Sequence, residues 1–539
     1  MSSESSAPAT TTLYRGGFVY GPANPLATAM VVDGEQIAWI GSEEAAAGLL
    51  DGVGQVVDLA GALVTATFVD AHVHTSATGM GLRSTALSDV RSLAAALDKI
   101  ESAARKRAGR AVYAPGWDEQ LWPEGRPPTA QELDRASYGG VVYSPRVDGH
   151  SAAISSALAA ASGARNHQGW NDSGLVTREA HHAARSCFYQ GISPAERRAD
   201  IDAALLAAAS EGIGLVHENG GPTLSSEADF ADVLEAGKRG TGPEVIGYWA
   251  ELVADEKSAR TLASRLGARG LAGDLNIDGS IGSRTAALRE AYVDGAGLDD
   301  QHSARSHDHE RRGNAYLTVD QVRDHVAACS LAGIQAGFHV IGDAGTDIAI
   351  GGIGAAAALV GRTKVVAARH RLEHLEMVDR FAIKTLVELG VTASVQPAFE
   401  AGWGGPNGMY AARLGERRAA GMNPFADMID AGLPLAFGTD SPVTPFAPWA
   451  AIAACVNHHE PAQRISAQQA FLAHTRGGWR AAGIDDRDNL DLGQPASFAI
   501  WSAGKKPGLP DLSPGAPPPT NLRTVIRGRT VFDREGALS

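Results

Sequence analysis

The stretch that most constrains this chain is segment 68–74, whose sequence is Phe-Val-Asp-Ala-His-Val-His. Apolar residues lead into it, and His72 and His74 lie two positions apart. Because successive side chains of a strand point to opposite faces, the two imidazoles would share one face. Two imidazoles at the C-terminal end of a strand suit a metal ion, which one histidine alone would not. The alternative is two polar residues that occur by chance on an exposed strand, since short motifs recur by accident.

The length and the charge of the chain limit its fold and its partners. With 539 residues, 44% of them hydrophobic, the chain can bury a large core, and we expect one large α/β unit with an accessory domain. The formal net charge is -14 and no cluster of Lys and Arg occurs, so neither nucleic acid nor an anionic membrane is an expected partner. No apolar run reaches about 18 residues, so we expect no membrane-spanning helix.

The cysteines and the N-terminus indicate the compartment. Cys187, Cys329 and Cys455 are widely spaced and form no CxxC motif, so we expect no disulfide and a cytoplasmic location. Residues 1–12 are rich in Ser, Ala and Thr and lack a basic region followed by an apolar one. We expect this segment to be disordered.

Both ends of the chain have the pattern of short β-strands. Residues 13–20 and 29–39 read as strands, and Asp33-Gly34 is typical of a hairpin turn. Segment 525–532 resembles segment 13–20 in pattern. The sequence therefore predicts a composite β-sandwich built from residues 13–64 and 488–539.

Between the two ends, strand-like and helix-like segments alternate, which favours a parallel α/β sheet or barrel over residues 65–487. One helix is expected from Thr318, which with Gln321 forms a capping-box pattern, to Gly333. More than eight strands are predicted, so some of them, in residues 111–148, are assigned to an insertion.

Three further strand candidates end in the same polar way as segment 68–74. They place His339, His374 and Asp440 where a strand gives way to a loop. In a (β/α)8 barrel the C-terminal ends of the strands converge on one site, and polar residues there are typical of catalysis. Each histidine taken alone is better explained as structural. Four histidines and one aspartate at strand ends, in this order, favour a metal site.

This order of residues resembles the metal-dependent amidohydrolase superfamily, and more narrowly its branch of N-substituted formamide deformylase-like amidohydrolases. The resemblance extends over about residues 13–532 and rests on further blocks, namely 116–118, 122–128, 146–151, 278–286, 410–415 and 438–443. It implies a (β/α)8 TIM-like barrel with a composite β-sandwich. It also implies hydrolysis of a carbon–nitrogen bond outside ordinary peptides, in a small-molecule substrate. The chain could form a homodimer.

The resemblance also assigns residues. It implies that His72, His74, His339, His374 and Asp440 bind the metal, with Asp440 as the catalytic proton carrier. Zinc is the expected ion for an imidazole-rich site with one carboxylate. Many members of the family carry a lysine, which can be carboxylated to bridge two metals, where this chain has Asp274. An aspartate has a shorter reach, so we expect one tightly held metal, or a second one held weakly.

Substrate contacts are expected from Trp117, Asp118, His150, Asp278, Arg284 and Gln396, with Trp122 and Arg146 as further candidates. Trp117 and Trp122 are equally well explained as core aromatics. Asp278 and Arg284 could instead pair with each other.

Three functions remain open at this point. The first is a hydrolase of a small, fairly apolar amide, formamide or cyclic amide. The second uses the same metal site to cleave an ester or a lactone. The third is a catalytically inactive relative that binds a ligand, against which the complete set of five ligand positions counts.

Overall fold

The computed structural model describes residues 11–538 except 22–23, 25, 148, 150, 295–310, 488–489 and 504–506. The chain divides into two compact units. The first comprises residues 1–74, 205–221 and 230–539, and the second comprises residues 75–204 and 222–229. The expected disorder of residues 1–12 falls almost wholly outside the described part, and it stays a prediction.

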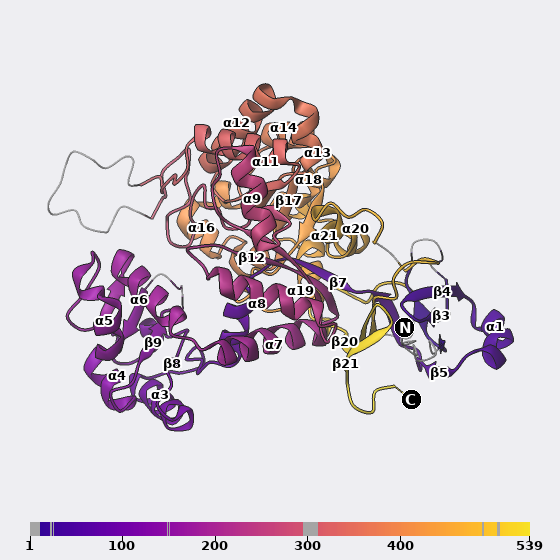
Figure 1. Ribbon diagram of the computed structural model, residues 1–539, viewed down its shortest axis with the longest axis horizontal. Coiled ribbons are helices and arrows are strands. Elements are labelled where there is room, and N and C mark those ends of the chain that lie inside the picture. Colours follow the sequence, from indigo (N-terminus) through magenta and orange to yellow (C-terminus); the bar gives the residue numbers. More distant parts are fainter. Residues whose placement is uncertain are drawn as a thin grey trace, which may run out of the picture. The chain divides into compact units, whose positions relative to one another are not determined.

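The first unit contains a parallel barrel of eight strands (Figure 1). The strands follow one another around the sheet in chain order, as a (β/α)8 barrel requires. They are β7 (Phe68–Val73), β12 (Ile213–Gly220), β13 (Glu244–Trp249), β14 (Gly270–Leu271), β15 (Gln335–Val340), β16 (Arg371–His374), β17 (Thr392–Val395) and β18 (Leu435–Phe437). The predicted fold class is therefore confirmed.

The barrel closes where the end of β7 meets the segment that follows β18. The Asp440 N–H donates to the His72 carbonyl at 2.8 Å, and the His74 N–H donates to the Ser441 carbonyl at 2.9 Å. These two backbone bonds continue the parallel pairing beyond the strands themselves, through a bridge between Val73 and Ser441. The first and last strands thus bring segment 72–74 and Asp440 side by side.

Helices follow most of the barrel strands along the chain. They include α8 (Glu227–Lys238), α9 (Glu256–Leu266), α11 (Val319–Ala332), α12 (Asp343–Val360), α13 (Arg362–Ala368), α14 (Arg380–Glu388), α15 (Pro397–Trp403), α16 (Met409–Leu414), α18 (Phe425–Asp430), α19 (Pro448–Val456), α20 (Ala467–Ala473) and α21 (Arg476–Ala481). Thr318 caps α11 through a complete capping box with Gln321, and the left-handed Gly333 ends the helix, as predicted.

One of these helices, α12, is both long and apolar. It has 18 residues with a mean hydropathy of 1.3, so by length and composition alone it could cross a membrane. It packs on α11 and α14 in the fold. A Cβ on Gly352 would lie 2.4 Å from Cγ1 of Val322 on α11, so only glycine allows this close approach. The face of α12 that carries Gly352 is thus packed against a neighbouring helix.

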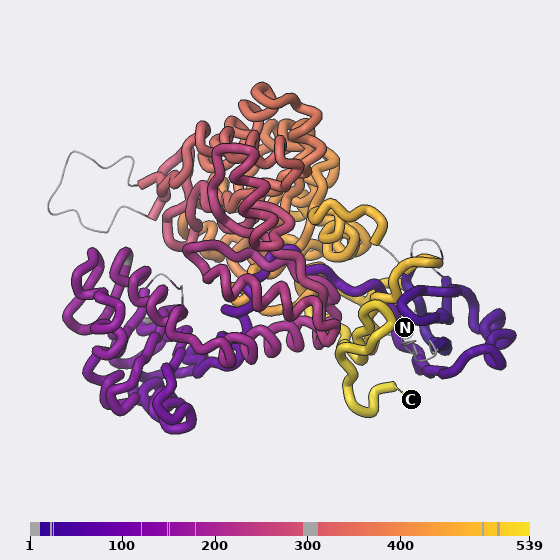
Figure 2. Tube along the Cα trace, viewed as in Figure 1, coloured from indigo at the N-terminus to yellow at the C-terminus, as the bar shows by residue number. Residues whose placement is uncertain are grey.

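Strands from both termini form two further sheets of the first unit. The tube shows the indigo N-terminal and the yellow C-terminal segments side by side (Figure 2). One sheet has the order β4-β3-β1-β5 and the other β2-β6-β19-β20-β21. Their strands are β1 (Thr12–Arg15), β2 (Phe18–Val19), β3 (Ala29–Asp33), β4 (Gln36–Gly41), β5 (Gln55–Asp58), β6 (Leu63–Ala66), β19 (Phe498–Ser502), β20 (Thr520–Ile526) and β21 (Arg529–Asp533). The predicted hairpin at Asp33-Gly34 joins β3 to β4.

The two sheets share one core, in which Tyr14 of β1 meets Phe498 of β19 with ring centroids 5.1 Å apart. The C-terminal β19 also pairs with the N-terminal β6. Residues from the two ends of the chain thus fold together, although β1 itself lies in the other sheet from β20 and β21.

The second unit is inserted between β7 and β12 and holds a sheet of the order β11-β10-β9-β8. Its strands are β8 (Val112–Tyr113), β9 (Val142–Pro145), β10 (Ser151–Ile154) and β11 (Leu175–Thr177), and its helices include α3 (Leu93–Arg107), α4 (Ala130–Ala136), α5 (Ser156–Ser162) and α6 (Arg178–Gln190). The strands predicted within 111–148 belong to this sheet and not to the barrel.

Three buried histidines of the first unit make its stability sensitive to acid. Burial lowers the pKa of His325 and of His474 to about 4, and burial together with His325 lowers the pKa of His370 to about 3. All three are therefore neutral in the fold, whereas in the unfolded chain they bind protons near pH 6.5. Stability from these groups is complete above pH 6.5 and is lost as the pH falls toward 4.

We predict that His474→Gln flattens this dependence. His474 Nδ1 donates to the Val69 carbonyl at 2.9 Å, and a glutamine amide can make the same bond. Between pH 6.5 and 4 the free energy of unfolding of the wild type should fall by roughly 3 kcal/mol more than that of the variant. Urea unfolding of both proteins at several pH values measures this difference. The other titratable groups contribute equally to both proteins, so their contributions cancel. If the free energies of unfolding of the wild type and the variant changed in parallel with pH, the low pKa assigned to His474 would be contradicted.

Candidate metal centre

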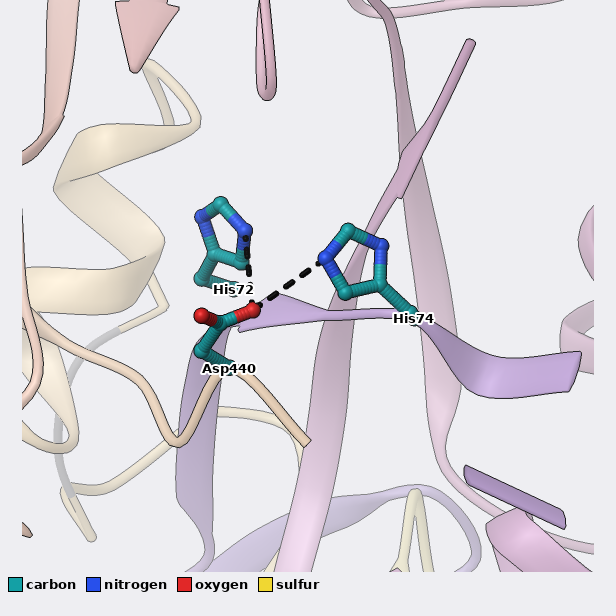
Figure 3. Close-up of side chains that lie close together, drawn as sticks. All are labelled: His72, His74 and Asp440. Atoms are coloured by element: carbon teal, nitrogen blue, oxygen red, sulfur yellow. Dashed lines mark ion pairs between the residues drawn. The ribbon is translucent and has the colours of Figure 1, made fainter. Parts of the chain in front are cut away.

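Five predicted ligands lie at the C-terminal ends of the barrel strands. His72 is in β7, and His74 is the first residue after that strand. His339 is in β15, His374 is the last residue of β16, and Asp440 follows β18. Nε2 of His74 lies 3.1 Å from Oδ1 of Asp440, and Nε2 of His72 lies 3.5 Å from the same oxygen (Figure 3). The ring centroid of His374 lies 5.1 Å from that of His72 and 4.4 Å from that of His339. The strand ends thus bring all five side chains together.

Asp274 lies among the four histidines. Its Oδ2 is 3.1 Å from Nε2 of His74, and its Oδ1 is 3.3 Å from Nε2 of His72. The same Oδ1 is 3.7 Å from Nδ1 of His339 and 3.8 Å from Nε2 of His374. The carboxylate of Asp274 therefore faces His72 and His74 as well as His339 and His374.

The approach of Asp274 depends on the loop after β14. Gly273 precedes it with a φ of +92°, and a Cβ there would lie 2.7 Å from the side-chain oxygen of Asn219. Only glycine allows this backbone to approach β12 so closely. The loop carries the Asp274 backbone inward, and the short side chain then reaches the histidines. The shorter reach of an aspartate thus does not keep Asp274 from the histidines, and the number of metal ions stays a prediction.

Hydrogen bonds orient each imidazole. The outer Nδ1 atoms of His72, His74 and His374 bond to Glu373 Oε2 at 3.0 Å, the Asn219 carbonyl at 2.9 Å and Gln396 Oε1 at 2.8 Å. In His339 it is Nε2 that faces outward, 3.2 Å from the Gly279 carbonyl. Because each acceptor is an oxygen, each outer nitrogen carries a proton, and the inner nitrogen is the one that would offer its lone pair to a metal ion.

The charges of the centre attract one another strongly. Burial opposes the charged form of His72, but Asp274, Glu373 and Asp440 outweigh it and raise its pKa to about 10. Burial likewise opposes ionisation of Asp274 and Asp440, but the neighbouring histidines hold the pKa of both carboxyls below the usual range. These shifts describe the side chains without a metal ion.

Three inward-facing atoms fit a metal ion. Nε2 of His72, Oδ1 of Asp274 and Oδ1 of Asp440 are buried, and none of them has a hydrogen-bond partner among the described residues. Buried polar atoms without a partner are costly, and ligation by a cation relieves that cost. His72, His74 and Asp440 form one group whose ligand atoms lie within 4.8 Å of one another, and His72, Asp274 and His374 form a second. The donor set of imidazole and carboxylate suits a transition metal such as zinc.

Asp70 connects the first strand to the loop that carries Asp440. Its carboxylate accepts the Thr439 N–H at 2.9 Å and the Thr439 hydroxyl at 2.6 Å. Burial raises the pKa of Asp70 to about 6, although its hydrogen bonds with Thr439 and His72 lower it. This residue was missed as a functional candidate, although an aspartate within an apolar strand was a visible signal.

Three predicted substrate residues of the first unit have internal partners. Gln396 accepts from His374, and Asp278 accepts the backbone N–H groups of Ala287, Ile341 and Gly342 at 2.8–2.9 Å. Burial raises the pKa of Asp278 to about 6. Arg284 pairs with Asp294 at 2.8 Å and not with Asp278, so the alternative pairing is wrong. A role of these residues in substrate binding stays a prediction.

The remaining candidates belong to the second unit. Trp117 and Trp122 are buried in its core, and their indole N–H groups donate to the carbonyls of Ser144 and Val90. Asp118 accepts from Arg146 at 3.1 Å. His150 lies outside the described residues. The core interpretation of the two tryptophans thus fits their surroundings, and their substrate role stays a prediction.

Comparison with known proteins decides the family. The sequence model of the amidohydrolase family matches residues 55–532. The chain belongs to this family. Protein LONG AFTER FAR-RED 3 of Arabidopsis thaliana is 25% identical over 514 residues, which cover 89% of this chain and 84% of the relative. N-substituted formamide deformylase of Arthrobacter pascens is 23% identical over 516 residues, which cover 88% of this chain and 90% of the relative.

A solved structure has the same fold. It is that of an uncharacterized metal-dependent hydrolase from Pyrococcus furiosus, which is 24% identical, with a TM-score of 0.74 over 92% of this chain and 99% of that one. As an amidohydrolase, this protein is a metal-dependent hydrolase acting on carbon–nitrogen bonds other than peptide bonds. The family assignment thus confirms the prediction of an enzyme.

Proposed function

We propose that this protein hydrolyses an amide, formamide or cyclic amide bond of a small molecule, with zinc held by His72, His74, His339, His374, Asp274 and Asp440. The observation that carries the proposal is the convergence of four oriented imidazoles and two carboxylates whose buried inner atoms include three without a partner. Bound zinc lowers the pKa of a coordinated water to about 7 and polarises a carbonyl oxygen, which is the activation that an amide needs.

The number of donors favours two ions over the single one expected from the sequence. Zinc in proteins takes about four protein or water ligands, and six side chains exceed the need of one ion. In the proposal His72, His74 and Asp440 hold one ion and His339 and His374 the other. Asp274 serves both, because its carboxylate lies within 3.1–3.8 Å of all four rings.

Asp440 is the proposed proton carrier. Its side chain is 11% exposed and lies beside both His72 and His74. In the proposal it accepts the proton of the attacking water and later donates a proton to the departing nitrogen. The bond between its own N–H and the His72 carbonyl fixes the backbone from which the carboxylate acts.

Aromatic side chains next to the centre support a fairly apolar substrate. Phe399 of α15 stacks on His374 with ring planes 8° apart and centroids separated by 6.0 Å. Trp403 packs on Phe399 at 4.5 Å and is partly exposed, and Tyr410 follows at 6.3 Å. Phe399 and Tyr410 are buried, so a substrate group on this side of His374 would meet the partly exposed ring of Trp403. The named activity of the Arthrobacter relative favours a carbon–nitrogen bond over an ester.

We further propose a cytoplasmic location. Cys187, Cys329 and Cys455 are all free, as in a reducing compartment. The homodimer stays a prediction.

We predict that Asp440→Asn lowers kcat by about 10²- to 10⁴-fold, which is the usual contribution of general acid–base catalysis. The other proposed ligands remain, so zinc content should fall much less than activity. Asp347→Asn, on the exposed face of α12, is the matched control and should leave both unchanged. Turnover of a panel of amides, with zinc measured on the same samples, tests this, and intact turnover would contradict the mechanism.

We predict about two zinc ions per chain in the wild type and fewer in Asp274→Ala, because the shared carboxylate is lost. His339→Ala and His374→Ala should lose metal and activity together. Plasma mass spectrometry of protein dialysed against metal-free buffer measures the content, with Asp347→Ala as the control. A single zinc that survives the loss of Asp274 would overturn the shared role and leave a one-metal hydrolase.

A further inference from the structure

An ion pair lies buried beneath the metal centre, inside the barrel. Arg371 and Glu373 of β16 are both fully buried, and Nε of Arg371 donates to Oε1 of Glu373 at 2.6 Å. They lie two positions apart, so their side chains share one face of the strand. Burying an ion pair costs desolvation, and apolar residues of the same size often stabilise a fold equally well. The pair therefore needs an explanation other than stability.

Arg371 is held by partners from five barrel strands. Its Nη2 donates to Glu373 Oε2 at 2.9 Å, to the Ala71 carbonyl of β7 at 2.6 Å and to Ser394 Oγ of β17 at 3.1 Å. Its Nη1 donates to Nδ1 of His217 in β12 at 3.1 Å, and its guanidinium lies 4.3 Å above the ring of Tyr248 in β13. This many contacts fix the guanidinium in one position, and its fork fixes the carboxylate of Glu373.

Glu373, held in this way, in turn orients the ring of His72. Its Oε2 accepts from Nδ1 of His72 at 3.0 Å, on the side of the ring away from the centre. Among the hydrogen bonds between described residues, the outer nitrogen of His72 meets a carboxylate, whereas those of the other three histidines meet two backbone carbonyls and an amide oxygen. An ionised carboxylate only accepts, so Nδ1 carries a proton, and Nε2, which faces Asp274 and Asp440, is the nitrogen left to bind a metal ion.

We propose that Arg371 and Glu373 are positioning residues that hold His72 in the tautomer and ring orientation for tight metal binding. The inference rests on the proposed function, because it assumes that His72 is a ligand. A carboxylate on the outer nitrogen raises the basicity of a ligating imidazole and fixes its direction. Arg371 holds this carboxylate in place and balances its charge inside the barrel.

Glu373→Gln tests the proposal, with zinc as the probe. Glutamine keeps the size of the side chain but removes the charge, and only one of its two terminal atoms can accept, so it cannot receive both Arg371 and His72 as before. We expect zinc to bind about 10- to 100-fold more weakly, as measured by competition with a chromogenic chelator. Asp347→Asn, which makes the same carboxylate-to-amide change on the exposed face of α12, is the matched control and should bind zinc as tightly as the wild type.

Three further measurements separate positioning from a general loss of structure. Glu373→Asp keeps the charge but draws it back from His72, and should also weaken zinc binding. The visible spectrum of the cobalt-substituted protein should change in both Glu373 variants, because the ligand field of His72 changes. Thermal unfolding of the apoprotein checks that the variants fold.

The outcomes distinguish the two proposals. Wild-type protein that binds no zinc would overturn the proposed metal centre and this inference with it. Wild-type protein that binds zinc tightly, with folded Glu373 variants that show the same affinity and the same cobalt spectrum, would overturn the positioning role alone.

Discussion

The closure of the barrel is the constraint on which the site depends. The last strand ends beside the first, and two backbone bonds, from Asp440 to His72 and from His74 to Ser441, join the segments that carry three of the proposed ligands. Asp70 adds a side-chain connection through Thr439. Asp440 lies more than 360 positions after His72 and His74 in the chain. Its Oδ1 is nevertheless held within 3.5 Å of Nε2 of both histidines. Parallel strands of a closed barrel all end at one rim, so His339 and His374 reach the same place.

The electrostatics of the centre follow from its burial. Two carboxylates and four imidazoles lie together in a buried site. Burying charged groups costs desolvation energy unless a partner of opposite charge offsets it. The orientation of each ring by an outer oxygen acceptor directs lone pairs inward, where a cation would stabilise both the carboxylates and the histidines. The metal centre proposed here thus accounts for polar atoms that otherwise have no partner.

The sequence was sufficient for the fold class and for much of the candidate site. Alternating segments favoured a parallel sheet or barrel, the family resemblance implied the (β/α)8 barrel, and strand-end positions located five side chains that do lie together. Periodicity cannot say how a loop runs, so the inward approach of the backbone at Gly273, which compensates for the shorter reach of Asp274, was missed. Long-range partners were also invisible: Gln396 was expected at the substrate but bonds to His374, and Arg284 pairs with Asp294. Arg371 and Glu373 had a signal in the Arg-Leu-Glu-His sequence, because two charges on one face of a barrel strand must be paired.

The most direct test of the metal centre is a crystal structure of zinc-loaded protein with anomalous data collected at the zinc absorption edge. We predict two anomalous peaks, one at His72, His74 and Asp440 and one at His339 and His374, both within bonding distance of Asp274. Absence of any peak at these six side chains, in protein that contains zinc, would contradict the account.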